Sequence, residues 1–108
     1  MSDFYHQYGE ISFVWDEDKN RENLRKHKID FETAALVFND DMRLEFIDYW
    51  HGEEVRYNTI GLVHDILFVV YTDRIDTESG KSDIRLISAR LASQLEKDAY
   101  NNNILGRK

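Results

Sequence analysis

The stretch that decides the fold of this chain is Ile66-Leu67-Phe68-Val69-Val70-Tyr71-Thr72. It is almost wholly apolar and rich in β-branched and aromatic side chains, which is typical of a central strand. The turn residues His64-Asp65 precede it and predict a short hairpin link to a strand over 55–62. A polar stretch over 73–82 follows it and leads to a last strand over 84–90. The second half of the chain therefore predicts an antiparallel meander.

Five further elements extend outward from this centre. The residue pattern predicts a strand over 11–15, helices over 17–27 and 31–38, a strand over 44–49 and a helix over 91–100. The order β-α-α-β-β-β-β-α predicts an α+β fold, in which an antiparallel sheet packs with two N-terminal helices and a C-terminal helix. We expect one domain over residues 1–108, with residues 1–10 as a flexible N-terminal extension.

The two outer helices carry different apolar patterns. Asp16 is an expected N-cap of the first helix, whose one large apolar residue, Leu24, predicts a narrow buried stripe. In the last helix, Leu91, Leu95 and Ala99 recur at four-residue spacing and predict one apolar face.

Composition narrows the functional classes. The chain has no cysteine, which excludes disulfides, thiolate metal sites and cysteine nucleophiles. No apolar stretch is long enough to span a membrane, and no export signal is visible, so we expect a cytoplasmic protein. The net charge is −7, and residues 1–54 carry 14 acidic and 6 basic side chains. This acidic half is either a solubilising surface or an attraction for a basic partner.

The first helix presents a cationic stripe. Lys19, Asn23 and Lys26 share one face, and His27 borders it. Such a stripe can bind phosphate and move a proton, because histidine titrates near neutral pH. The alternative is a solvated face with surface ion pairs, for instance between Glu22 and Lys26.

Three arginines lie on predicted strands: Arg56, Arg85 and Arg90. The planar guanidinium fork suits phosphate, and an internal ion pair is the alternative role. Tyr71 can stack on a base, or it can belong to the core. No HExxH motif or strand-borne carboxylate pair indicates a metal site, and no motif indicates a cofactor.

Together these residues resemble the BrnT family, the toxins of BrnT/BrnA type II toxin–antitoxin modules. The resemblance covers about residues 11–100. The matching positions are Phe13, Trp15, Asp16, Lys19, Asn23, Lys26, His27, Ile29, Phe31, Glu32, Ala34, Val37, Phe38, Asp40, Arg56, Ile60, Gly61, Leu67–Thr72, Ile84–Arg90, Ala92, Glu96 and Tyr100.

The resemblance implies a RelE-like fold and a small ribonuclease that cuts RNA and halts translation. The resemblance also implies a partner, a BrnA-like ribbon-helix-helix antitoxin. In the complex, only the antitoxin would contact operator DNA. We expect metal-independent cleavage, in which the RNA 2′-OH attacks the adjacent phosphate and leaves a cyclic phosphate.

The expected site follows from the resemblance together with the residue chemistry. Arg56, Arg85 and Arg90 would neutralise the phosphoryl charge, and Lys26 or His27 would bind phosphate or transfer a proton. Lys19 and Tyr71 would bind RNA, and Trp15, Phe31 and Phe38 would pack the core. Val55 stands where the family usually has an acidic residue. The alternative function is therefore a catalytically weak or inactive member that acts only through its antitoxin complex.

Overall fold

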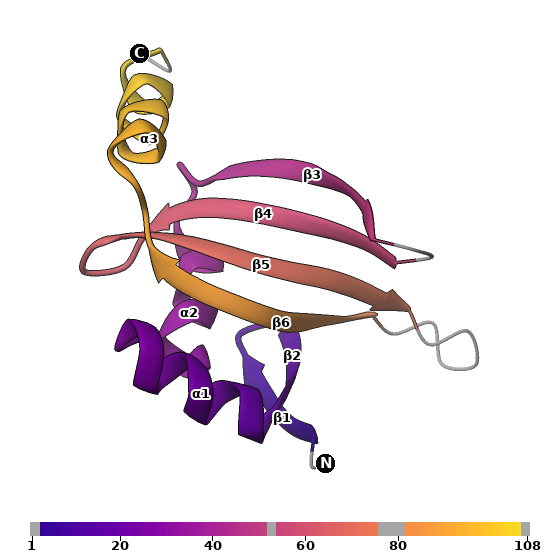
Figure 1. Cartoon of the computed structure of the whole chain (residues 1–108). Helices are drawn as coiled ribbons and strands as arrows, with labels where there is room; N and C mark the ends of the chain where they lie inside the picture. The colour runs from indigo at the N-terminus through magenta and orange to yellow at the C-terminus, as the bar shows by residue number, and fades with distance from the viewer. Residues whose placement is uncertain (1–2, 52–53, 76–81, 107–108) are drawn as a thin grey trace.

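The computed structural model describes residues 3–51, 54–75 and 82–106. Its elements are β1 (Asp3–Tyr8), β2 (Ile11–Asp16), α1 (Glu17–His27), α2 (Phe31–Ala35), a 3-10 helix η1 (Leu36–Asn39), β3 (Leu44–His51), β4 (Glu54–Leu62), β5 (Ile66–Ile75), β6 (Ser82–Leu91) and α3 (Gln94–Gly106). Figure 1 shows α1 and α2 below the sheet and α3 at the end of the sheet where the β4–β5 hairpin lies.

The described strands form one mixed sheet of the order β1-β2-β6-β5-β4-β3. The meander β3–β6 is antiparallel, as the sequence predicted. The prediction of a purely antiparallel sheet is wrong, because β2 pairs with β6 in parallel, with Ser12 opposite Asp83 and Val14 opposite Arg85. A parallel pair needs a long connection between its strands, and the helices and the meander supply that connection here.

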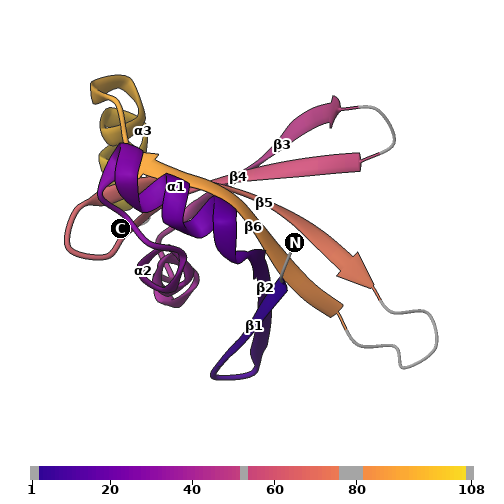
Figure 2. The same cartoon turned by 60° about the horizontal axis from the view of Figure 1, so that its bottom comes forward.

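The N-terminus differs from the expected flexible extension. Residues 3–8 form β1, which pairs with β2 from Asp3 opposite Asp16 to Tyr8 opposite Ile11. The Phe4 ring stacks on Trp15, with ring centroids 5.3 Å apart. Backbone pairing and this aromatic contact hold the segment, and neither is visible as a periodic pattern in the sequence. Figure 2 shows the β1–β2 hairpin projecting beyond the helices.

Helix α1 begins where its sequence predicts but buries an unexpected residue. Asp16 caps it by accepting a hydrogen bond from the Asp18 N–H at 2.8 Å. Leu24 is 46% exposed, whereas Asn23 is 7% exposed. The Asn23 amide donates to the carbonyls of Ile29 and Ala89 at 2.9 and 2.8 Å, and accepts from the Ala89 N–H at 3.1 Å. Asn23 therefore continues the hydrogen-bonded edge of β6 beyond the segment that β2 covers.

The core lies between the sheet and α2–η1. Trp15, Phe31 and Phe38 are buried there, as predicted. Asp30 caps α2 through the Thr33 N–H at 2.7 Å, and the predicted second helix continues past Ala35 as the 3-10 turn. Gly61 allows β4 to approach η1, because a Cβ atom at this position would collide with the Val37 side chain.

Helix α3 is held by polar contacts. Tyr100 donates a hydrogen bond to the Asp40 carboxylate, and Asn103 donates to the Met42 carbonyl at 3.1 Å. The expected apolar face is not buried: Leu95 is 80% exposed, and Leu91 belongs to the exposed end of β6. None of the helices in the described ranges is long and apolar enough to cross a membrane.

Candidate active site

Two of the three predicted arginines share a row on the sheet face away from α2. Thr72 of β5 pairs with Arg85 of β6, and Tyr57 of β4 pairs with Tyr71 of β5. Continuing the β4–β5 register by one residue places Arg56 beside Thr72. Arg56 and Arg85 therefore flank Thr72, with Cα atoms roughly 10 Å apart across two strand spacings. For both to contact one phosphate between them, the Arg85 guanidinium would have to turn from Asp3 of β1 toward β5.

The row includes polar atoms that sequence reasoning missed. Thr72 is buried, and Asn58 shares its face of the sheet two residues after Arg56 on β4. Thr72 Oγ1 and Asn58 Oδ1 are buried and have no hydrogen-bond partner within residues 3–51, 54–75 and 82–106. Buried polar atoms are normally paired, so these two oxygens mark an unsatisfied polar position beside the arginines. Strand alternation with Arg56 was the sequence signal for Asn58.

Each arginine of this row faces a carboxylate. Arg85 donates to Asp3 of β1 at 2.7 Å, with side chains 24% and 35% exposed respectively. Arg56 lies opposite Asp48 in the β3–β4 register. No sequence signal linked Asp3 to the site, because 82 positions separate it from Arg85.

Arg90 is set apart from this row. It pairs with Phe68 on β5, four residues and roughly 13 Å along the strand from Thr72. Its guanidinium donates two hydrogen bonds to Glu96 of α3, at 2.8 and 2.9 Å, and lies 4.1 Å from the Phe68 ring centroid. Hydrogen bonding to Glu96 raises the pKa of Arg90. This geometry is that of a structural pair that fixes the start of α3.

The Arg90–Glu96 pair predicts a pH dependence of stability. Hydrogen bonds from Arg90 lower the pKa of Glu96 from 4.5 to about 2. A depressed folded pKa stabilises the fold above 4.5, and this contribution is lost as the pH falls toward 2. Because the Arg90 side chain is 40% exposed, solvent screens the pair, and we expect the pair to contribute about 1 kcal/mol to the free energy of unfolding.

We therefore expect Glu96→Gln to lower the melting temperature by roughly 4–8 °C between pH 5 and 7. The difference from wild type should shrink below pH 4.5 and vanish near pH 2. Exposed Glu32→Gln is the control, and an equal shift in both variants, or a shift constant down to pH 2, would contradict the assignment.

The α1 stripe forms a second basic region. A pocket of 210 Å³ lies between α1 and β6, with Lys19, Lys26 and His27 on the helix side and Ser88 on the strand side. Ser88 follows Arg85 by three residues on β6. The pocket therefore lies about 10 Å along the strand from Arg85. Lys26 also contacts Glu22 at 3.4 Å, the surface pair that the sequence suggested.

Tyr71 does not join either region. It is 5% exposed, its ring stacks on Tyr57 with centroids 5.4 Å apart, and its hydroxyl donates to Glu45 at 2.9 Å. Burial and the neighbouring Glu45 carboxylate raise the pKa of Tyr71. Its predicted role in stacking on RNA is not supported, because the ring is part of the core.

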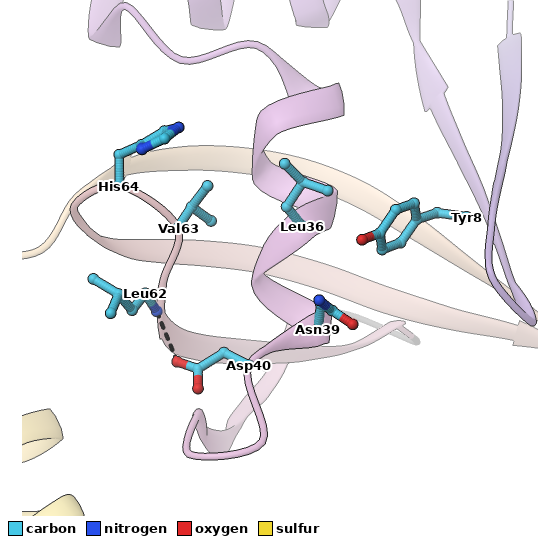
Figure 3. Close-up of a pocket in the computed structure, with 7 residues that line it drawn as sticks. All are labelled: Tyr8, Leu36, Asn39, Asp40, Leu62, Val63 and His64. Carbon is cyan, nitrogen blue, oxygen red and sulfur yellow. Dashed lines mark hydrogen bonds between the residues drawn. The ribbon is translucent and has the colours of Figure 1, made fainter.

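A larger pocket of 370 Å³ lies elsewhere, between the β1–β2 turn, η1 and the β4–β5 hairpin. Figure 3 shows Tyr8, Leu36 and His64 around it, and Asp40 accepting a hydrogen bond from the Leu62 N–H. This hydrogen bond joins the loop after η1 to the β4–β5 hairpin, which gives this region a structural role. No group of three or more histidine, aspartate and glutamate side chains in the described parts of the chain is arranged to hold a metal ion.

A sheet that carries Arg56 and Arg85 on the face away from α2 can hold a phosphodiester on that face. Over residues 15–96 the sequence matches the family described as "Ribonuclease toxin, BrnT, of type II toxin-antitoxin system". This match covers most of the chain, which therefore belongs to the BrnT family of ribonuclease toxins.

The fold has a counterpart among solved structures. The 1.1 Å crystal structure of the Brucella abortus ribonuclease toxin BrnT is similar, with a TM-score of 0.52 and 23% sequence identity. The similarity covers 76% of this chain and 96% of that chain. No curated protein sequence matches the chain.

Proposed function

We propose that this protein is a toxin that cleaves RNA without a metal ion and thereby inhibits translation. The observation that carries the proposal is the pair Arg56 and Arg85, flanking Thr72 on the open face of a BrnT-family sheet. The 2′-OH oxygen attacks the adjacent phosphorus and gives its proton to water, the P–O5′ bond breaks, and the 5′-oxygen takes a proton from water, which leaves a cyclic phosphate and a free 5′-OH. The two guanidinium groups neutralise the charge that develops on the phosphoryl oxygens.

The remaining basic residues act on the RNA beside the cut. Lys19, Lys26 and His27 line the pocket next to Ser88, about 10 Å from Arg85 along β6. This spacing suits contacts to flanking phosphates of the same strand better than proton transfer at the cleaved phosphate. Phosphate contacts of this kind position a nucleic acid without selecting its sequence.

The partner that we propose is a BrnA-like ribbon-helix-helix antitoxin, and the complex contacts operator DNA through that antitoxin. Membership of a type II toxin–antitoxin family supports an antitoxin partner. The excess of acidic side chains in residues 1–54 favours a basic partner over free nucleic acid. Such a pair acts in the cytoplasm, where its RNA substrate is found.

Inducing this chain alone in bacteria should slow growth and fragment cellular RNA, and co-expression of its antitoxin should restore growth. Growth curves and RNA integrity at matched soluble protein levels measure both effects. Normal growth with intact RNA at high soluble expression would instead favour the inactive member that acts through its antitoxin complex.

Cleavage by the purified protein should persist in excess EDTA, because the proposed chemistry uses arginines in place of a metal ion. The assay follows a labelled RNA and identifies a cyclic phosphate at the new end. Activity that disappears on chelation and returns with a divalent cation would overturn this mechanism.

A further inference from the structure

Strand β1 lies outside the segment that matches the toxin family, which begins at residue 15. It nevertheless pairs with β2 along its whole length, from Asp3 to Tyr8. The Phe4 ring stacks on Trp15, which is buried in the core. β1 is therefore an ordered strand that places Asp3 at a defined position on the sheet.

That position is beside Arg85. Val14 of β2 pairs with Arg85, and Asp3, on the neighbouring strand β1, reaches the Arg85 guanidinium with one carboxylate oxygen at 2.7 Å. A carboxylate and an RNA phosphate are both oxyanions that the same guanidinium fork binds. Asp3 is therefore bound to the same guanidinium group, that of Arg85, with which the proposed reaction would bind the RNA phosphate.

The Asp3–Arg85 ion pair has fewer hydrogen bonds than the Arg90–Glu96 ion pair. Arg90 gives two hydrogen bonds to Glu96, each from a different nitrogen, whereas Arg85 gives Asp3 one. Asp3 and Arg85 are both partly exposed, so water and salt reduce their attraction. Such a contact can be displaced by a competing phosphate.

We propose that Asp3 is a built-in competitor for the RNA phosphate, so that β1 attenuates this toxin by holding Arg85 in an autoinhibitory ion pair. The inference rests on the proposed function, since it takes Arg85 as a phosphate ligand. If Asp3 instead oriented Arg85 for catalysis, its removal would weaken the interaction with RNA. The two roles thus predict opposite signs.

The test measures binding of the full chain to a 2′-O-methyl RNA oligonucleotide, which lacks the attacking hydroxyl and cannot be cleaved. Asp3→Asn should tighten binding by about twofold to fivefold, the range expected for one exposed ion pair. Glu10→Gln is the matched control, because Glu10 is an exposed acid in the β1–β2 turn and its loss changes the net charge equally. Asp3→Glu, which keeps the carboxylate, should bind like wild type.

Two readouts separate masking of Arg85 from a structural effect of β1. The slope of log affinity against log salt should steepen by about 0.7 in Asp3→Asn, which corresponds to one more phosphate contact on a single strand. In an Arg85→Ala background, Asp3→Asn should tighten binding no more than Glu10→Gln does. Melting temperatures confirm that each variant is folded.

The inference is overturned if Asp3→Asn binds no more tightly than Glu10→Gln, if it binds more weakly, or if its gain persists without Arg85. Absence of binding by both wild type and Asp3→Asn overturns it as well. Cleavage of the matching all-ribose RNA is scored separately. If the variants bind as expected but none cuts, the ribonuclease proposal fails while the masking contact stands. If they cut RNA without the expected change in binding, the masking proposal fails while the ribonuclease proposal stands.

Discussion

Replacing Arg56 with alanine should lower the rate of RNA cleavage by roughly 100- to 1,000-fold, the usual loss when one stabiliser of transition-state charge is removed. Arg56 is partly exposed, so the melting temperature should fall by no more than about 4 °C, equivalent to ~1 kcal/mol. Arg85→Ala should behave in the same way, because both side chains flank Thr72.

The control for both variants is Arg21→Ala, which removes the same charge from an exposed position on α1. Single-turnover cleavage and melting temperature are measured for each protein. If Arg56→Ala cuts RNA at the wild-type rate, or loses activity only together with its folded structure, Arg56 does not belong to the site.

Asn23→Ala should be among the most destabilising substitutions where α1 contacts β6. It removes three hydrogen bonds and leaves the Ala89 N–H and the carbonyls of Ala89 and Ile29 without their partner. Unpaired buried backbone groups cost about 1–3 kcal/mol each, and water entering the space left by the Asn23 amide should limit the total to about 3 kcal/mol. The melting temperature should fall by roughly 12 °C or more.

The matched control is the neighbouring Leu24→Ala. Leu24 is the large apolar residue of α1, yet it is 46% exposed, so its truncation should cost about 1 kcal/mol or less. Chemical denaturation of both variants gives the comparison. A larger loss for Leu24→Ala than for Asn23→Ala would show that apolar burial, and not the amide, anchors α1 to the sheet.

The arginines show how far chemistry could be read from residue type. The guanidinium group predicts affinity for either phosphate or carboxylate, and the sequence left both roles open for Arg56, Arg85 and Arg90. The sheet register separates them, because it places two beside Thr72 and the third opposite Phe68 next to Glu96. The distinction depends on which strand residues become neighbours, a long-range property that spacing along one strand does not contain.

Local patterns determined much of the fold by themselves. The apolar run of β5, the capping residue Asp16, and the aromatic residues Trp15 and Phe31 all have the structures that they predicted. Each of these signals acts within a few residues: a cap satisfies the next N–H groups, and an apolar run needs burial whatever covers it. That is why the sequence alone was sufficient for them.

Tertiary structure decided what depends on distant partners. It paired β2 with β6 in parallel, made residues 3–8 a strand, buried Asn23 in place of Leu24, and left Leu95 exposed. It also placed Asp3 on Arg85 and Tyr71 in the core. Hydrogen bonds and ion pairs of this kind join groups that the folded chain brings together, and their free energy exists only once the sheet has formed. A one-dimensional pattern therefore carries the propensity of each residue, and the folded sheet determines its partner.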